Sequence, residues 1–524
     1  MRRCVTLLVF AMVAVAMTAQ AAHAQLPGVN PADTYQVNGP RVRSVVVVGD
    51  NVWIGGIFSQ VQTGNGSNAG GVQNLAVLSG TTGQVPGGVN PLALGGISGA
   101  QVWKLAVLGN TVYASGKFKL ASGGNSYTNL LAFNGSTGAL VSGFRPTGVK
   151  VSQAVAAGGG RVYAGGKQLA AYDASTGAKL GGFATSSVGI DSSLRGHNTP
   201  AQHRELLLTG GFLYSACQCD SLTQGGSTRQ TKSLVRFDPS SGAHDQSFSP
   251  QGAGTASFGI GVATDGDDIY LGAGGSDFVA KYAPSGNQIW KRDTSGSAQA
   301  VAVSGDDLIV GGHFLEIGDQ PGDTCGFKSS NPGTLDPNDE CVTRERLAAY
   351  SLDGSLRSWN PSVTGKYNGV WAIALDAGSV HIGGEFKKVH GVAQTFYARL
   401  DPGGSSSSEA TTTTTPVLAE LVTSSPLPVQ PDREVSFTLR CPDAANPCDG
   451  SVRLIAAGSK QAGPDPIALG PLGEATYTVT LNDAAWNKLM SKPNGKVGGS
   501  LKLTATGGSE TTLSDTIKIQ LELV

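Results

Sequence analysis

The chain has 524 residues, of which 75 are glycine and only 14% are charged, and its formal net charge is −1. This composition excludes a charge-rich disordered chain and a helical one, and it is typical of many short strands joined by tight turns. Neither sign of charge forms a long run, which argues against nucleic acid or an anionic membrane surface as a partner, because both are met by a basic face.

The first 24 residues predict a secretory signal peptide. Arg2 and Arg3 supply the positive start, residues 5–17 are apolar, and residues 22–24 form a small-residue cleavage site. The apolar stretch is too short to span a bilayer, and no later segment is long and apolar enough, so we expect no membrane insertion. The protein is therefore predicted to be secreted, extracellular or cell-wall-associated.

One sequence pattern returns seven times between residues 42 and 404 and predicts a repeat protein. Each copy begins with an apolar strand, passes a polar turn and continues into a second strand that ends in Gly-Gly. A third strand follows after a spacer, and a fourth often closes with an aromatic residue near proline, as at Phe144, Phe248 and Trp359. Four strands per unit is the size of a propeller blade. The copies span 44–58, 105–118, 154–167, 206–217, 262–272, 300–314 and 372–386.

A ring of these units is expected because a lone four-stranded sheet leaves both faces and both edges unsatisfied. The paired glycines fit this arrangement, since sheet faces approach most closely where no side chain intervenes. The seventh unit ends after Leu400 without a fourth strand, and residues 33–38 (DTYQVN) could supply it and close the ring. An open arc or another number of blades is the alternative. The expected fold class is all-β, with a seven-bladed β-propeller over residues 25–404.

The repeats resemble the bacterial delta-60 family of propeller repeats, whose units carry Val-Tyr-x-Gly-Gly-x-Phe and a later Leu-Ala-x-x-Asp-x-x-x-Gly. Residues 52–58, 112–118, 308–314 and 380–386 match the first part. Units three to five lack the phenylalanine, and unit four replaces both glycines, at Ser215 and Ala216. The resemblance implies a structural pattern and brings no catalytic residues.

Six cysteines follow the predicted signal, an even number in an oxidising compartment, so disulfides are expected. Loop closure favours pairing in sequence order, and cross-pairing stays open. The C-x-C pair is interpreted first as a structural disulfide, with a redox or a metal role as alternatives. The expected pairs are Cys325 with Cys341, Cys441 with Cys448, and Cys217 with Cys219.

Residues 405–416 form a Ser/Thr-rich linker, and residues 417–524 resume a period of two in six or seven short strands. That size is typical of an immunoglobulin-like β-sandwich. One short helix is expected over residues 482–490. The loop between Cys441 and Cys448, followed by a helix between strands, resembles an immunoglobulin-like accessory domain of exported bacterial proteins. The resemblance implies a spacer or an adhesion module.

No short catalytic motif is present: H-E-x-x-H, G-x-S-x-G, the P-loop and C-x-x-C are all missing. We therefore assign no catalytic residue and no bound organic cofactor. A quinone-binding propeller would be expected to repeat a tryptophan in each unit. The tryptophans of the repeats are interpreted as standing at unrelated positions: Trp53, Trp103, Trp290, Trp359 and Trp371.

The loops that join second to third strands are expected to share one face of the ring, because strands alternate in direction within a blade. Loops on a rigid scaffold are the usual place for binding residues, so this loop-rich face is the predicted site. Neutral drift in tolerant surface loops is the alternative. The long loops are 59–73, 119–128, 218–232, 315–346 and 387–395, with the connection 186–200 opening on the same face.

An acidic loop framed by Cys325 and Cys341 could hold calcium, because carboxylate oxygens are the ligands that Ca²⁺ prefers. The spacing is not that of an EF-hand, and a solvated acidic loop is the alternative. His313 and His390 approach the same face and are interpreted as polar strand-end or loop residues rather than ligands. The candidate calcium ligands are Asp319, Asp323, Asp336 and Asp339.

Together these patterns favour an exported, non-catalytic binding or scaffold protein that uses the loop-rich face for a glycan or an extracellular protein. The first alternative is a propeller hydrolase or lyase acting on extracellular polysaccharide. The second is a purely structural envelope component. Paired carboxylates, or a histidine with a carboxylate, at the channel mouth would favour the enzyme, and an aromatic-dotted or filled channel would favour binding or structure.

Overall fold

A computed structural model describes residues 26–523, apart from 64–65, 70–72, 191–200, 252–257, 327–340, 377, 403–417, 443–447, 457–458, 461–464, 470–472 and 507–511. The predicted signal peptide and linker, as well as Asp336 and Asp339, lie outside the described residues. Within them the regular secondary structure is β-strand apart from one helix. This agrees with the all-β expectation.

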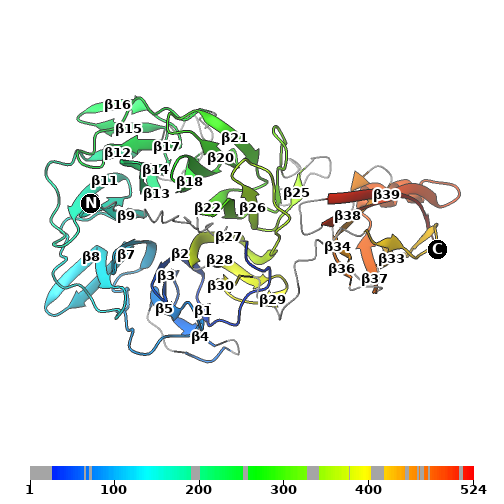
Figure 1. The fold of residues 1–524 in the computed structure, drawn as a ribbon, viewed down its shortest axis with the longest axis horizontal. Helices are drawn as coiled ribbons and strands as arrows, with labels where there is room; N and C mark the ends of the chain where they lie inside the picture. The colour runs from blue at the N-terminus through cyan, green and yellow to red at the C-terminus, as the bar shows by residue number, and fades with distance from the viewer. Residues whose placement is uncertain are drawn as a thin grey trace, which may run out of the picture.

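Seven antiparallel sheets follow one another between residues 41 and 400, and Figure 1 shows them around a common centre. Their first strands are β2 (Arg41–Val48), β6 (Gln101–Leu108), β9 (Ala154–Gly158), β13 (Gln202–Thr209), β18 (Phe258–Thr264), β22 (Ala298–Ser304) and β27 (Val363–Asp376). Their second strands are β3 (Asn51–Ile57), β7 (Thr111–Ser122), β10 (Arg161–Gly165), β14 (Phe212–Gln218), β19 (Ile269–Gly274), β23 (Asp307–Gly312) and β28 (Ser379–Val389). Their third strands are β5 (Leu75–Ser79), β8 (Asn125–Asn134), β11 (Gln168–Asp173), β17 (Leu234–Phe237), β20 (Phe278–Tyr282), β26 (Leu347–Ser351) and β30 (Tyr397–Leu400).

Each sheet packs against the first strand of the next sheet, and β27 and β28 of the last sheet pack against β2 of the first. The first glycine of the Gly-Gly pair lies at these contacts. A Cβ atom on Gly55 would lie 2.5 Å from Cγ1 of Val102 in the second sheet. A Cβ atom on Gly383 would lie 2.5 Å from Cγ1 of Val42, which joins the seventh sheet to the first. The same glycine contact thus forms the ring and closes it.

Side-chain hydrogen bonds also join six of the seven sheets to the turn after the third strand of the next. Trp53 Nε1 donates to the carbonyl of Gly135 at 3.1 Å, and Tyr113 Oη donates to that of Ala174 at 2.8 Å. The same link is repeated by Tyr163 to Pro239, Arg236 to Pro284, Trp290 to Leu352 and, across the closure, Arg399 to Gly80. Buried donors in the core are therefore satisfied by the neighbouring repeat.

The predicted fourth strands form in only two of the sheets, as β12 (Ser186–Gly189) and β21 (Gln288–Asp293). In three other sheets the outer segment makes a single bridge, such as Phe133 with Leu140 and Phe237 with His244. The aromatic residue beyond that bridge fixes the segment by packing instead. Phe144, for example, is buried edge-on against Tyr113 at a ring distance of 5.3 Å. The start of the 186–200 connection is also strand rather than loop.

The ring is closed by a segment earlier than the predicted residues 33–38. Pro31 bridges Leu400, and Gly28 N and Ala32 N donate to the carbonyls of Asp401 and Arg399. The predicted segment instead forms β1 (Gln36–Asn38), which pairs with β4 (Gln60–Gln62) in the first loop. Its partner strand lies in a spacer that carries no repeat pattern, so this pairing could not be predicted from the repeat.

In unit four, the two residues that replace the Gly-Gly pair lie one position further along the chain than the sequence analysis assigned them. Glu205 pairs with Ala216 as Ser44 pairs with Gly55, so the glycine positions are occupied by Ala216 and Cys217, not by Ser215 and Ala216. The next sheet makes room for the Ala216 methyl group, because the residue that faces it there is Gly259. The close contact between these two sheets is kept by moving the glycine to the other side.

The remaining strands before residue 403 lie in the spacers between second and third strands. They are β15 (Ser221–Gln224), β16 (Ser227–Gln230), β24 (Glu316–Ile317), β25 (Val342–Thr343) and β29 (Val392–Ala393). The spacers that bear them are thus partly ordered hairpins. β12 joins one of them by pairing with β15.

The C-terminal part folds around its own core, which includes Phe437, Leu454 and Leu501. Among the described residues of this part there is one helix, α2 (Asp483–Met490), which confirms the helix expected over residues 482–490. The Asn482 side chain caps it, and Ala485 and Leu489 are buried. Its strands are β31 (Glu420–Leu421), β32 (Leu427–Val429), β33 (Glu434–Arg440), β34 (Cys448–Ala456), β35 (Ser459–Lys460), β36 (Asp465–Leu469), β37 (Glu474–Thr480), β38 (Lys496–Thr506) and β39 (Thr512–Leu523).

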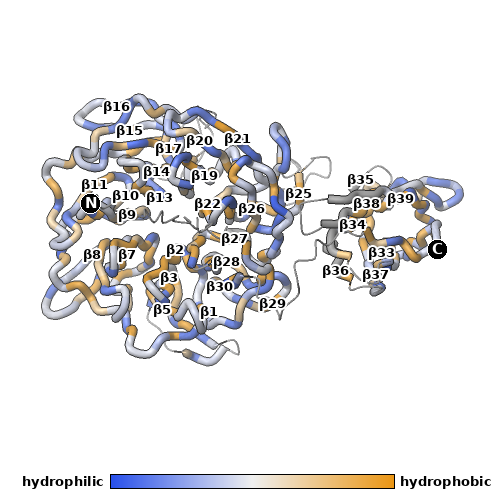
Figure 2. The backbone as a smooth tube through the Cα atoms, viewed as in Figure 1, coloured by the Kyte–Doolittle hydropathy of each residue, from blue (hydrophilic) through white to orange (hydrophobic). Residues whose placement is uncertain are grey.

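Figure 2 shows hydrophobic stretches along many of the strands and hydrophilic ones in many of the connections. Of the residues that the structure describes, no helix is both long and apolar enough to cross a membrane.

Replacing Gly383 with alanine is expected to lower the free energy of unfolding by about 1–3 kcal/mol, the usual cost of overpacking. The added methyl group meets the branched, stiff side chain of Val42 across the ring closure. Gly182→Ala is the matched control, because a Cβ there meets nothing within 4 Å. Chemical unfolding of both variants measures the difference, and equal losses would show that this contact does not hold the ring.

Candidate functional site

Six of the seven first strands carry an irregular register near their start, where one residue is left out of the pairing. Such a bulge bends the strand and redirects the extra side chain. In the third sheet Gln153 directly precedes β9 and takes the same place. The seven residues at this position are Arg43, Trp103, Gln153, Arg204, Ile260, Gln299 and Trp371.

The second glycine of the pair makes room for this bulge. A Cβ on Gly56 would collide with the carbonyl oxygen of Arg41, and one on Gly384 would collide with that of Gly369. Each of these carbonyls belongs to the residue two positions before a bulge residue. Arg41 precedes Arg43, and Gly369 precedes Trp371. The Gly-Gly motif therefore has two separate tasks, which are packing against the next sheet and shaping the strand start within its own sheet.

All seven bulge residues, together with Lys104, line one cavity of about 20 Å³. This volume has room for about one water molecule. Because each sheet contributes one residue, the cavity lies at the centre of the ring. We call it the ring-centre cavity.

Arg43 lies between two indole rings. Its guanidinium carbon is 3.7 Å from the ring centroid of Trp103 and 5.0 Å from that of Trp371, in the two flanking sheets. Burial, and then repulsion by Arg41 and Arg204, lower the pKa of Arg43 to about 9, although Glu385 opposes the shift. The group stays cationic at neutral pH, and the indole faces supply part of the stabilisation that water would give.

Arg204 is fixed by two amide oxygens. Its Nη1 donates to Gln153 Oε1 at 3.1 Å and its Nη2 donates to Gln218 Oε1 at 2.8 Å. Burial lowers the pKa of Arg204 to about 10, which still leaves it charged near pH 7. Neither partner is anionic, so the hydrogen bonds orient the guanidinium without neutralising it.

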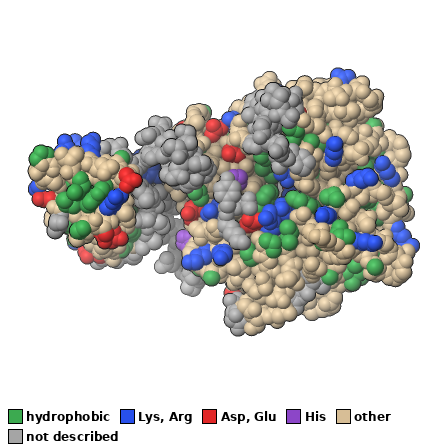
Figure 3. All heavy atoms as spheres, turned by 180° about the vertical axis from the view of Figure 1, so that it is seen from behind, with side chains coloured by type: hydrophobic (Ala, Val, Ile, Leu, Met, Phe, Trp, Pro, Cys, Tyr) green, Lys and Arg blue, Asp and Glu red, His purple; other side chains and the backbone are tan. Residues whose placement is uncertain are grey.

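Two further cations around the cavity are paired. Lys104 forms an ion pair with Glu205, and Arg41 Nε lies 2.5 Å from Glu385 Oε1. The cavity and these partners thus hold four cations, Arg41, Arg43, Lys104 and Arg204, against two carboxylates. Figure 3 shows Lys and Arg side chains near the middle of the ring on the face in view.

The ring-centre cavity opens at the end of the sheets from which the long loops leave. In the first sheet Arg41 pairs with Ile57, so the start of the first strand lies opposite the end of the second. Gln101 with Lys117 and Gln202 with Gln218 repeat this pairing in other sheets. The loop-rich face predicted from the sequence therefore surrounds the mouth of this cavity.

The interpretation of the tryptophans as unrelated was wrong for two of them. Trp103 and Trp371 take the same bulge position in units two and seven. Every bulge residue stands twelve positions before the first glycine of its unit or the residue replacing it, from Arg43 and Gly55 to Trp371 and Gly383. That constant spacing was the available signal, and it was hidden because the residue type changes from unit to unit.

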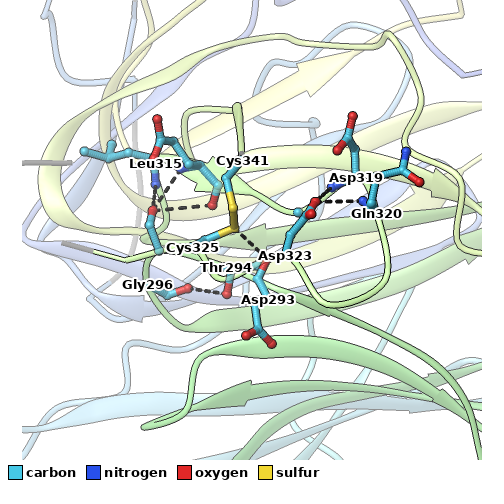
Figure 4. Close-up of a disulfide and its surroundings, with 12 residues drawn as sticks. Asp293, Thr294, Gly296, Leu315, Asp319, Gln320, Asp323, Cys325 and Cys341 are labelled. Carbon is cyan, nitrogen blue, oxygen red and sulfur yellow. Dashed lines mark hydrogen bonds between the residues drawn. A yellow bond between two sulfur atoms is a disulfide. The ribbon is translucent and has the colours of Figure 1, made fainter. Parts of the chain in front are cut away.

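The acidic loop is only partly described. Asp323 accepts the backbone N–H groups of Asp319 at 2.9 Å and Gln320 at 2.8 Å, which stabilises the turn. Figure 4 shows the carboxyl groups of Asp319 and Asp293 pointing away from each other. Of the residues that the structure describes, no group of three or more His, Cys, Asp or Glu side chains could hold a metal ion. Calcium binding, which also involves Asp336 and Asp339, stays a prediction.

The two loop histidines have different surroundings. His313 lies beside the ring-centre cavity, with Nδ1 3.2 Å from Nε2 of Gln299, and burial lowers its pKa to about 4. His390 is exposed in a turn with φ of 47°.

The six cysteines come together in the three expected pairs. The Cα–Cα separations are 5.3 Å for Cys217–Cys219, 5.6 Å for Cys325–Cys341 and 5.4 Å for Cys441–Cys448. The second pair joins the two ends of the acidic loop, close to the backbone of Asp293 (Figure 4).

The sequence matches no protein-family model and no curated protein. Among solved structures it is similar to the extracellular domain of a proposed one-component system of B. thetaiotaomicron, with 8% identity, a TM-score of 0.40, and coverage of 94% of this chain and 58% of that one. An ancestral GH74 enzyme has 11% identity, a TM-score of 0.35, and coverage of 93% and 63%. The chain thus spans less than two thirds of either. With these scores below 0.5, neither likeness assigns a function.

His203, next to Arg204, is expected to make the free energy of unfolding depend on pH. It is fully buried, its Nδ1 lies 2.7 Å from Ser215 Oγ, and burial lowers its pKa to about 3. Between pH 6.5 and about 3 the unfolded chain binds a proton that the folded chain does not. The free energy of unfolding should therefore fall with decreasing pH, by up to about 1.4 kcal/mol per unit from this residue.

His203→Gln is expected to reduce this slope in unfolding curves measured between pH 6 and pH 4. His390→Gln at the exposed turn is the control and should keep the slope of the unchanged protein. An unaltered slope in His203→Gln would show that His203 is not held neutral.

Proposed function

We propose that this protein is an exported, non-catalytic binding protein that binds a glycan outside the cell at the centre of its loop-rich face. The observation that carries the proposal is the ring-centre cavity, to which seven successive sheets contribute one side chain each from an equivalent position. Convergent polar and aromatic groups in a hollow are the usual marks of a ligand site.

The proposed architecture places a signal peptide at residues 1–24, a seven-bladed β-propeller at 25–404, a linker at 405–416 and an immunoglobulin-like β-sandwich at 417–524. The ring of seven sheets supports the propeller, and the separate C-terminal core supports the sandwich. The cysteine pairs support a secreted, extracellular or cell-wall-associated protein, because disulfides persist in oxidising compartments. We infer that the sandwich acts as a spacer.

The chemistry of the cavity supports binding over hydrolysis or elimination. Its walls combine two guanidinium groups, an ammonium group, two indoles and two amides. Indoles and amides do not titrate near pH 7, and the pKa values of Arg43 and Arg204, about 9 and about 10, keep both charged. General acid–base catalysis instead needs a group whose pKa lies near the working pH. These groups are suited to holding a ligand.

The test is a binding screen of the full chain against neutral and acidic extracellular oligosaccharides. We expect at least one of them to bind, and Trp371→Ala to raise its Kd at least fivefold, because the indole forms one wall of the cavity. Trp371→Phe serves as a milder variant that keeps a ring against Arg43.

Asp267→Asn is the matched control, because Asp267 lies in the turn between β18 and β19, at the opposite end of the sheet. It should leave Kd unchanged. The proposal fails if no oligosaccharide binds, or if both tryptophan variants bind as well as the unchanged protein while remaining folded.

A further inference from the structure

Among the residues that the structure describes, the two guanidinium groups that line the ring-centre cavity, Arg43 and Arg204, form no ion pair with a carboxylate. Lys104 and Arg41 each have a carboxylate partner, in Glu205 and Glu385. Arg43 lies over indole faces, and Arg204 donates its hydrogen bonds to the neutral amides of Gln153 and Gln218. Buried charges are costly unless they are paired, so this arrangement favours a ligand that brings negative charge.

Hydrogen-bond donors in the cavity walls point to the same conclusion. Within the described part of the chain, the buried atoms Arg43 Nε and Arg204 Nε, and the indole Nε1 atoms of Trp103 and Trp371, have no hydrogen-bond partner. All four are donors only, and buried polar groups are normally satisfied. A ligand group that accepts several hydrogen bonds would satisfy them.

The size and shape of the cavity narrow the choice among anions. About 20 Å³ admits only a small end of a larger molecule. The Arg43 guanidinium lies over two indole rings, and because a guanidinium is planar it matches a planar carboxylate, which can accept two parallel hydrogen bonds. A tetrahedral sulfate or phosphate group is bulkier and does not lie in one plane.

A sugar acid fits the surroundings better than an acidic peptide side chain. Two amide side chains, those of Gln153 and Gln299, line the cavity beside the cations. An amide group both donates and accepts hydrogen bonds, so a ligand that can do both matches these walls. The hydroxyl groups next to the carboxylate of a uronic acid do both, whereas an ionised Asp or Glu side chain only accepts.

We propose that the ring-centre cavity binds the carboxylate of an acidic glycan, with Arg43 and Arg204 as the groups that recognise the charge. This inference rests on the proposed function and names its ligand class. One oxygen of the carboxylate enters the cavity, which has room for about one water-sized group, and the rest of the glycan lies on the loop-rich face.

The experiment compares trimers of galacturonic, glucuronic and mannuronic acid with trimers of galactose, glucose and mannose, using the full chain and isothermal titration calorimetry. At least one acidic trimer is expected to bind tenfold or more tightly than its neutral counterpart, with an affinity that falls as salt is added. Arg43→Gln and Arg204→Gln should each remove most of this preference. Arg43→Lys keeps the charge without the flat fork and should lose part of the preference.

Lys179→Gln removes a positive charge from an exposed site outside the cavity and is the matched control. It should keep the full preference for the acidic trimer. A tri-glutamate peptide at the same net charge should bind at least tenfold more weakly than the acidic trimer.

Equal binding of acidic and neutral trimers would overturn the inference and leave the proposed function standing. Tri-glutamate binding as tight as that of the acidic trimer would also overturn it, because the charge alone would then suffice. Loss of preference in Lys179→Gln equal to that in Arg43→Gln would show that the recognition lies outside the cavity. If no trimer and no other oligosaccharide binds, the proposed function itself fails.

Discussion

The structure depends on how closely the faces of neighbouring sheets approach at the glycine positions. Where Gly55 and Gly383 lie against Val102 and Val42, a methyl group has no room. A glycine makes the same contact with the next sheet at Gly165, Gly272 and Gly311. Ser115 takes this position in unit two, and in unit four the glycine is residue 259 of the neighbouring sheet. The fold therefore constrains the contact rather than the residue that provides it.

The same glycine pair sets the position of the functional groups. The second glycine leaves space for the carbonyl that precedes the bulge, and the bulge turns one side chain per sheet toward the centre. Arg43 then lies between Trp103 and Trp371 because its sheet lies between theirs. A planar cation between two aromatic faces loses little freedom when it binds an anion, since its orientation is already fixed. The geometry of the ring thus fixes the positions of the side chains that line the proposed binding site.

Much of the fold could be predicted from the sequence, and the parts that could not have physical reasons. Strand pairs and the capped helix follow from local patterns, as with Asn482 and the buried Ala485 and Leu489. The closing segment was misplaced because β1 finds a partner in a spacer, a choice that depends on tertiary contacts. The predicted binding face surrounds the candidate site, but its central residues were missed. Arg43, Gln153 and Trp371 share a place in the repeat without sharing a chemical type.

The fifth sheet carries an apolar residue at the bulge position, and it can be compared with the sheets that carry a polar residue there. Ile260 occupies the same position as Arg43 and Arg204, with the same irregular register in its strand. The bulge therefore accepts an aliphatic side chain, and the fold alone does not require a cation there. Two unneutralised guanidinium groups and several unpaired donors at one point lower stability relative to such an apolar centre. In a purely structural protein nothing would offset this loss of stability. In a binding protein an anionic ligand offsets it, because the ligand completes the hydrogen bonds and stabilises the folded state.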